Sequence, residues 1–198
     1  MDDAPTHYLV IDVEATTDEN YRTVPRSQTE IIEIGAVLVD ARTLSPEADF
    51  QTFVRPVRHP KLTDFCTRLT TIIQREVDCA PLFPEAIGLL TRFIGDRDAL
   101  FCSWGAYDNN QFKQDAKHHK IVLPFGGRHL NVKEQFSAQL GEDRRYGMDG
   151  ALRRVGLPLV GTHHRGIDDA RNIARLLPFA LGRAIAPARG AREEPSAL

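Results

Sequence analysis

The chain has 198 residues, of which 42% are hydrophobic and 26% are charged, and its formal net charge is −2. This composition is typical of a soluble globular protein with one substantial core. The small net charge argues against a protein that coats a long duplex, which would carry a strongly basic face. No apolar run is long enough to span a bilayer, so we expect no membrane partner. An acidic N-terminus that leads almost directly into a strand predicts no signal peptide and a cytoplasmic location.

The first third of the chain predicts three strands. An apolar run rich in β-branched residues marks the first, and alternation of apolar with polar side chains marks the third. The segments between them are polar and contain proline, which favours a loop and a hairpin connection. The expected order is a strand over Tyr8–Glu14, a loop over Thr16–Gln28, a strand over Ile31–Val39, a hairpin connection over Asp40–Asp49 and a strand over Phe50–Arg55.

The rest of the chain predicts helices that alternate with two further strands. The expected helices are Thr63–Leu69, Ile72–Val77, one from Pro84 to Ile94, Tyr107–His118, one ending at Leu140, Met148–Val155 and Ile167–Leu181, with strands at Ala99–Ser103 and His129–Val132. This order favours one α/β domain over residues 1–181, in which helices cover both faces of a mixed sheet. The composition of residues 182–198 predicts a disordered tail.

Two acidic side chains stand at the end of the first predicted strand. Because successive side chains on a strand alternate between its faces, Asp12 and Glu14 point the same way. Two like charges at the end of a buried strand repel each other and lose their hydration. A bound cation removes both penalties, and hard oxygen ligands of this kind suit Mg²⁺ or Mn²⁺. The pair therefore predicts a divalent-metal site.

The last predicted helix carries two consecutive aspartates that face different ways. At about 100° per residue, Asp169 lies at the edge of the apolar face, beside Ile173. Asp168 lies nearly opposite, among arginines, and is expected to be a solvated surface charge. We therefore expect Asp169 to be the functional carboxylate of the two.

A further carboxylate and an imidazole complete the candidate set. Asp108 follows the strand that ends at Ser103, and taken alone it is better explained as a helix N-cap. His164 stands five residues before Asp169 and can accept a proton near neutral pH, as an activating base for water must. Taken alone, His164 is a loop histidine without a role, which is the interpretation we keep for His163. The whole constellation favours a function for Asp108 and His164.

In this combination, Asp12-x-Glu14, Asp108 and His164-x-x-x-x-Asp169 resemble the DEDDh exonucleases, whose name gives these residue types in order. The resemblance extends from about Tyr8 to Leu177. Longer stretches are similar to the branch that trims RNA 3′ ends, which includes histone-mRNA and small-RNA 3′-end exonucleases and bacterial proteins of the KapD type. These stretches are Ile11–Thr16, Leu62–Thr70 and His164–Arg175, and the form Trp104-Gly105-x-Tyr107-Asp108 is similar to the bacterial members. Thr71 stands where the family often has glycine.

The resemblance implies a ribonuclease-H-like fold with about five strands. It implies that two divalent ions, Mg²⁺ or Mn²⁺, are held by Asp12, Glu14, Asp108 and Asp169, and that His164 takes the proton from the attacking water. It further implies contacts with the terminal nucleotide. The candidate contacts are the backbone of Ala15 with the ribose, and the side chains of Phe65, Leu69 and Trp104 with the last base. For Phe65 and Leu69, a place in a helix core is an equally good explanation.

The expected function is a 3′–5′ exonuclease that releases nucleoside 5′-monophosphates from single-stranded nucleic-acid 3′ ends, with RNA favoured over DNA. The alternative is the same chemistry on DNA 3′ ends, as in proofreading or repair. A nucleic-acid-binding module without activity and a metal phosphatase acting on small nucleotides are less favoured, because every residue type of the catalytic set is present. The sequence leaves the natural substrate, protein partners and oligomeric state open.

Overall fold

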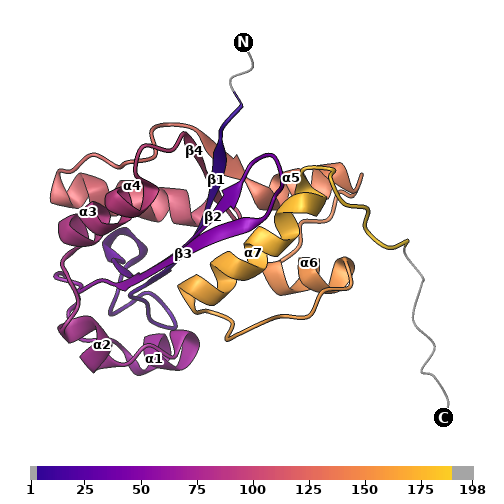
Figure 1. Ribbon diagram of the computed structural model, residues 1–198. Helices are drawn as coiled ribbons and strands as arrows, with labels where there is room; N and C mark the ends of the chain where they lie inside the picture. Colours follow the sequence, from indigo (N-terminus) through magenta and orange to yellow (C-terminus); the bar gives the residue numbers. More distant parts are fainter. Residues whose placement is uncertain (1–3, 189–198) are drawn as a thin grey trace.

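Five strands form one mixed sheet in the computed structural model, which describes residues 4–188 (Figure 1). The strand order is β3-β2-β1-β4-β5. The elements in chain order are β1 (His7–Ala15), the 3₁₀ helix η1 (Arg26–Gln28), β2 (Ile31–Asp40), β3 (Pro46–Phe53), α1 (Asp64–Thr70), α2 (Gln74–Asp78), α3 (Phe83–Ile94), β4 (Ala99–Ser103), α4 (Tyr107–His119), β5 (His129–Asn131), α5 (Val132–Gln139), α6 (Met148–Arg154) and α7 (Gly166–Ala180).

The central strand is β1, which pairs antiparallel with β2 and parallel with β4. Both of its faces are covered, and Leu9, Val10 and Ile11 are fully buried, as expected of a continuous apolar strand in the middle of a sheet. Its register with β2 places Glu14 opposite Glu33. The acidic end of β1 is therefore held between two strands.

Helices cover both faces of the sheet (Figure 1). On one face, α3 and α4 pack against alternate residues of β1 such as Leu9 and Ile11. On the other face, α5, α6 and α7 pack against residues such as Val10 and Val37. A smaller cluster joins α1 and α2 to Ile32 of β2. This arrangement confirms the expected mixed sheet with helices on both faces.

The predicted elements agree with the structure to within two residues at each end, except for the third strand. β3 begins at Pro46, which pairs with Val39, so the expected hairpin connection over residues 40–49 is too long. The reason is that β3 is an edge strand whose first half is largely exposed, so it lacks the apolar pattern of a buried strand. A proline is tolerated there because the first residue of an edge strand need not donate a ladder hydrogen bond.

Residues 182–198 follow α7 at the C-terminal end of the chain. Residues 182–188 of the expected tail contain no helix or strand, and they contact the body through Arg154, whose Nη1 donates to the Pro187 carbonyl at 2.8 Å. Residues 189–198, on which the rest of the expected tail falls, lie outside the described residues. Within residues 4–188, none of the helices has the length and apolar character needed to cross a membrane.

Candidate active site

A cleft of about 410 Å³ opens where the carboxyl ends of β1 and β4 meet the first turn of α7. In open α/β sheets, the carboxyl ends of parallel strands are the usual place for a ligand, because loops diverge there. Most of the residues that the sequence singles out line this cleft. They are Asp12, Glu14, Ala15, Leu69, Trp104, Asp108, His164 and Asp169.

Three of these carboxylates converge. The structure brings carboxylate oxygens of Asp12, Glu14 and Asp169 to within 4.8 Å of one another. Burial raises the pKa of Asp12 well above its ordinary value, and the neighbouring Asp108 and Glu14 raise it further. Among the residues that the structure describes, no hydrogen-bond donor reaches the carboxylate of Asp12 or Glu14. The Asp12 and Glu14 carboxylates therefore lack the compensation that buried charges require.

Asp108 lies beside this group on the first turn of α4. The helix begins at Tyr107 with Ala106 as its N-cap, so Asp108 does not cap it. Its side chain is 4% exposed and its Oδ1 accepts a hydrogen bond from the backbone nitrogen of Val13 at 3.1 Å. Burial raises the pKa of Asp108 to about 6, although the Val13 hydrogen bond opposes that shift. The bond fixes the start of α4 against the acidic end of β1.

The two aspartates of α7 face different surroundings. Asp169 is 4% exposed and lines the cleft. The Asp168 side chain is half-buried outside the cleft, where its Oδ2 accepts a hydrogen bond from the Thr162 nitrogen at 2.8 Å. The helix therefore directs only Asp169 toward the β1 carboxylates.

The start of α7 is placed by residues of β2. Glu33 is completely buried, and its Oε2 accepts hydrogen bonds from the Gly166 nitrogen and from Arg165 Nε, each at 3.1 Å. Gly35 gives room for this approach, because a Cβ on it would lie 2.1 Å from the Gly166 carbonyl carbon. Only a residue without a side chain allows two backbones to pass so closely.

Both histidines before α7 touch Asp169, by different routes. The His164 nitrogen donates to Asp169 Oδ2 at 3.0 Å, while its ring is half-buried in the cleft. His163 Nδ1 lies 2.9 Å from the same oxygen, and the two imidazoles stack with centroids 4.0 Å apart. Burial lowers the pKa of His164, and the neighbouring His163 lowers it further. His164 is therefore a neutral imidazole near pH 7, able to accept a proton.

The candidate contacts for a terminal nucleotide are only partly assembled. Ala15, Leu69 and Trp104 line the cleft. Trp104 is fixed in place because its Nε1 donates to the Tyr146 carbonyl at 3.1 Å. Phe65 does not line the cleft in the structure and is half-buried on α1, one turn before Leu69.

Several residues of the cleft were given no role by the sequence, and three of them carry side chains suited to ligand contact. His163 contacts Asp169, and Tyr21 and Tyr107 line the rim. Tyr107 is 55% exposed although it stands beside a buried aspartate. An exposed aromatic side chain next to a predicted site residue is a signal that could have found Tyr107. No periodic pattern marks Tyr21, because it lies in an irregular loop.

The donor set fits a hard divalent cation. Asp12, Glu14 and Asp169 supply oxygen atoms at mutual distances that one ion can bridge. The Arg165 guanidinium acts to lower the pKa of Glu14, but it is bound to Glu33 at 3.1 Å. The carboxylate chemistry matches Mg²⁺ or Mn²⁺ better than a soft metal.

A family model, curated relatives and solved structures all indicate the same family for this chain. A model of the exonuclease family (RNase T) matches residues 9–177. ERI1 exoribonuclease 3 of Mus musculus is 31% identical over 182 residues, which cover 86% of this chain and 52% of the relative. The probable 3′-5′ exonuclease KapD of Bacillus subtilis is 29% identical and is covered over 81% of its length. The chain thus spans about half the length of the ERI1-type relatives it matches.

Solved structures agree. The nuclease domain of 3′hExo, described as a DEDDh family member bound to rAMP, superposes with a TM-score of 0.84 at 28% identity, covering 92% of this chain and 95% of that domain. The cell-death related nuclease 4 structure superposes with a TM-score of 0.78 at 23% identity, which shows the fold alone. The ribonuclease-H-like architecture of these nucleases is the one described above. The chain therefore belongs to the exonuclease family of DEDDh type.

Proposed function

We propose that this protein is a metal-dependent 3′–5′ exonuclease that releases nucleoside 5′-monophosphates from the 3′ ends of single-stranded RNA. The observation that carries the proposal is the convergence of Asp12, Glu14 and Asp169, whose carboxylate oxygens lie within 4.8 Å of one another at the end of the central strand. Membership in the family implies dependence on divalent metal ions. The active domain is assigned to residues 1–181 and the location to the cytoplasm.

The metal count and identity belong to the proposal. We assign two ions, Mg²⁺ or Mn²⁺, to Asp12, Glu14, Asp108 and Asp169. When bound, such a pair stabilises charge on the scissile phosphate and on the attacking and leaving oxygens. The chain's part is to hold four acids rigidly. The Val13 nitrogen fixes Asp108, and the His164 nitrogen fixes Asp169.

His164 is the group assigned to move the proton. Its half-buried ring faces the cleft, and its lowered pKa keeps it neutral at pH 7. A neutral imidazole can take a proton from the attacking water and return it to solvent. Because the backbone of His164 is held on Asp169, the base is fixed relative to the acidic cluster.

In this proposal, the 3′ terminus is recognised because the last nucleotide fits into the cleft. Trp104, Leu69 and Ala15 line the cleft together with Glu14, and we assign the side chains of Trp104 and Leu69 to the last base and the backbone of Ala15 to the ribose. Stacking of a base on an aromatic ring tolerates any base, which suits an enzyme that removes nucleotides one after another. Phe65 is proposed as a further base contact, reached if α1 shifts toward the cleft.

The preference for RNA is supported by the relatives. Several curated relatives are exoribonucleases. One solved structure, which superposes with a TM-score of 0.84, shows a 3′-exonuclease that recognises a histone mRNA stem-loop. The solved nuclease domain of 3′hExo is bound to rAMP, a ribonucleotide. The proposed substrate is therefore a single-stranded RNA 3′ end.

The test uses 5′-labelled RNA and DNA oligonucleotides of identical sequence, incubated with Mg²⁺ or with chelator. The proposal expects a ladder that shortens from the 3′ end, nucleoside 5′-monophosphates as products, no activity with chelator, and faster loss of RNA. Asp12→Asn removes activity without unfolding the chain. Equal or faster loss of DNA overturns the RNA preference. Intact oligonucleotide with wild-type protein and Mg²⁺ favours a binding module, and release of inorganic phosphate from nucleotides favours a phosphatase.

A further inference from the structure

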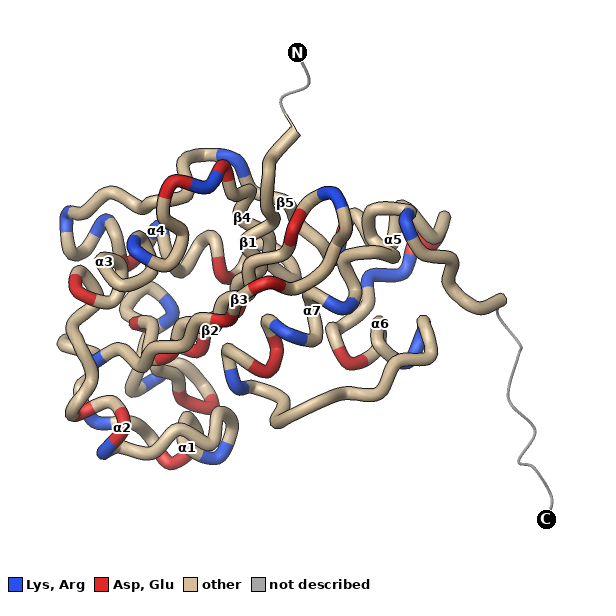
Figure 2. Tube along the Cα trace, in the orientation of Figure 1, with Lys and Arg blue, Asp and Glu red and all other residues tan. Residues whose placement is uncertain are grey.

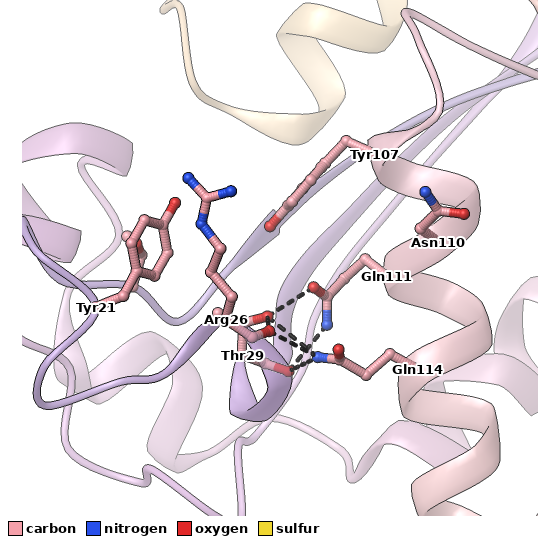
Figure 3. A pocket seen from close by; sticks show the side chains of 8 residues that line it. Tyr21, Arg26, Thr29, Tyr107, Asn110, Gln111 and Gln114 are labelled. Carbon is pink, nitrogen blue, oxygen red and sulfur yellow. Dashed lines mark hydrogen bonds between the residues drawn. The ribbon is translucent and has the colours of Figure 1, made fainter.

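A second cavity, of about 360 Å³, adjoins the acidic cleft. The two share three lining residues, Thr17, Tyr21 and Tyr107, so they form one continuous depression. Figure 3 shows the second cavity with Tyr21 and Arg26 from the loop after β1 on one side and side chains of α4 on the other. A substrate chain whose end lies at the cleft can therefore continue into this cavity.

The floor of the second cavity is already built. Thr29 Oγ1 donates to Gln111 Oε1 at 2.8 Å, and Gln111 Nε2 returns a hydrogen bond to the Thr29 carbonyl at 2.9 Å. Gln114 Nε2 also donates to the Thr29 carbonyl, at 2.8 Å. These bonds fasten the end of the loop to α4 (Figure 3). A ligand would meet a preformed surface, which reduces the ordering that binding requires.

The rim of the second cavity presents an aromatic ring and a cation together. The Arg26 guanidinium lies 4.5 Å from the centroid of the Tyr21 ring. Tyr21 is 39% exposed and has a φ of 53°, a conformation that residues other than glycine adopt rarely. The loop holds it there because Asp18 accepts backbone hydrogen bonds from Asn20 and Arg22 on either side. A strained, exposed aromatic held in place by its own loop is typical of a binding surface.

A third cavity, of about 710 Å³, continues from the second along α4 and shares Asn110 and Gln114 with it. It is lined on α4 by Lys113 and Lys117, with His118 beside them. The lysines of α4 are blue in Figure 2. From Tyr107 to Lys117 the helix rises about 15 Å.

Helical spacing aligns these residues with the rim of the cleft. Tyr107, Asn110, Gln114 and Lys117 follow one another at intervals of three or four residues, which places them on one face of a helix. The lining of the second and third cavities, as far as residues 4–188 are concerned, includes no carboxylate, whereas the cleft is lined by four. Nor does any described residue form an ion pair with Arg26, Lys113 or Lys117. The sign of the charge thus changes from acidic at the cleft to basic along α4.

We propose that this face is the binding track for the nucleotides on the 5′ side of the scissile phosphate. The track consists of Tyr21, Arg26, Tyr107, Asn110, Lys113 and Lys117. Tyr21 and Tyr107 stack on bases, and Arg26, Lys113 and Lys117 neutralise phosphates. Aromatic platforms interleaved with cations are how single-stranded nucleic acids are held without sequence preference. The inference rests on the proposed function, since it assumes that a nucleic-acid 3′ end occupies the cleft.

The track is tested with substrates of two lengths. The variants are Tyr21→Ala, Arg26→Ala and the pair Lys113→Ala with Lys117→Ala. Arg42→Ala is the matched control, because it removes the same charge from an exposed site in the turn between β2 and β3, at the far end of β1 from the cleft. For a single-stranded RNA of about twelve nucleotides, KM rises about tenfold in each track variant. In Arg26→Ala and in the double lysine variant, whose side chains lie outside the cleft, kcat and the KM for a dinucleotide stay unchanged. Tyr21→Phe keeps the ring and restores the wild-type KM.

Equilibrium binding separates failure of the track from failure of the proposed activity. Fluorescein-labelled oligouridylate of about twelve nucleotides is titrated in Ca²⁺ over a range of salt concentrations. Each phosphate contact that is removed reduces the slope of log K against log salt by about 0.7, so the double lysine variant loses about 1.4. If wild-type protein cleaves nothing but the track variants still lose affinity, the track stands and the nuclease function falls. If the track variants bind and turn over long RNA as Arg42→Ala does, the track is refuted.

Discussion

Glu33 accepts a hydrogen bond from the backbone nitrogen of Gly166 at 3.1 Å, so the buried part of β2 fixes the start of the helix that carries Asp169. Glu33 also lies opposite Glu14 in the antiparallel register. Like charges directly opposite each other on a sheet destabilise it. The Arg165 guanidinium, bound to Glu33 at 3.1 Å, offsets that repulsion. Helix placement and charge balance at the cleft therefore depend on the same carboxylate.

We expect Glu33→Gln to lower the free energy of unfolding by about 2–3 kcal/mol. The variant removes the negative partner of the Arg165 guanidinium, and its amide NH₂ group can face the nitrogen donors of Arg165 and Gly166, to which it cannot bond. Arg165 is 21% exposed, so water screens part of this loss. Turnover should fall as well, since α7 loses its anchor. Urea unfolding with Glu134→Gln as control gives the comparison, because Glu134 forms an exposed pair with Arg145. Equal losses in the two variants would show that Glu33 has no anchoring role.

Gly35 is predicted to be intolerant of any side chain. A methyl group there would lie 2.1 Å from the Gly166 carbonyl carbon, so the backbone of α7 must move. We expect Gly35→Ala to destabilise the protein by at least about 3 kcal/mol and to abolish turnover, because Asp169 moves with the helix. Gly127→Ala is the control, since a Cβ there meets nothing within 4 Å. A Gly35→Ala protein with normal melting temperature and activity contradicts this account.

The acidic cluster predicts that the stability of the metal-free protein falls as pH rises toward neutrality. Burial raises the pKa of Asp12 and Glu14, and raises that of Asp108 to about 6. A carboxyl group whose pKa is higher in the folded than in the unfolded chain stabilises the fold below its unfolded pKa of about 4. This contribution is lost as pH rises through the pKa in the folded chain, which is about 6 for Asp108. In chelator, the melting temperature of wild type relative to Asp12→Asn should therefore fall between about pH 5 and about pH 7.5.

Mg²⁺ should reverse this loss, and mainly at the higher pH, because the ions bind ionised carboxylates. The measurement is thermal unfolding at both pH values with and without Mg²⁺, on wild type and on Asp12→Asn. A wild-type melting temperature that rises with pH in chelator, relative to the variant, would mean that these carboxylates are not desolvated as the structure indicates. A shift with Mg²⁺ of equal size in both proteins would mean that Asp12 is not a ligand.

Periodicity predicted which way a side chain faces within its own element. The orientations of Asp12 and Glu14 on a strand, and of Asp169 on a helix, could be predicted without knowing the fold. In the structure, all three side chains line one cleft. Their roles as ligands stay predictions. The pattern could not reveal Glu33, because an acid between isoleucines in a buried strand acquires its partners from α7, more than a hundred residues later.

Loops and edges limited the sequence analysis for a different reason. β3 is an exposed edge strand without an apolar pattern, so its first four residues were placed in a hairpin connection. His163 was given no role, because which of two adjacent histidines turns toward a carboxylate is decided by the backbone. Here His164 has a φ of 64°, which lets its nitrogen and the His163 ring reach Asp169 together. No local signal in the sequence predicts that conformation.

Thr71 is predicted to weaken the fold. It ends α1 with a φ of 62°, the left-handed conformation that suits glycine at a helix C-terminus. A β-branched side chain is strained there, and it is exposed, so little contact is lost on removing it. We expect Thr71→Gly to raise the free energy of unfolding by about 0.5–1 kcal/mol. Thr91→Gly, within α3, should lower it by about the same amount. A loss of stability in both variants would contradict the assigned strain.

The two histidines are predicted to differ in what they contribute. His164→Ala should lower kcat by roughly 10²- to 10⁴-fold, the range expected when a general base is removed. Its Mg²⁺ affinity should survive, since the acids remain and the Asp169 contact is made by the backbone. Isothermal titration with Mg²⁺ and single-turnover cleavage of labelled RNA measure the two quantities separately.

His163→Ala is the matched variant, because it removes the neighbouring imidazole, which lies 2.9 Å from Asp169 but is more exposed. We expect it to lower kcat much less than His164→Ala and to change the Mg²⁺ affinity instead, because the Asp169 carboxylate loses its side-chain partner. Loss of metal binding in His164→Ala would show that this ring is a ligand and not the base. A larger kcat loss in His163→Ala than in His164→Ala would assign the proton transfer to His163.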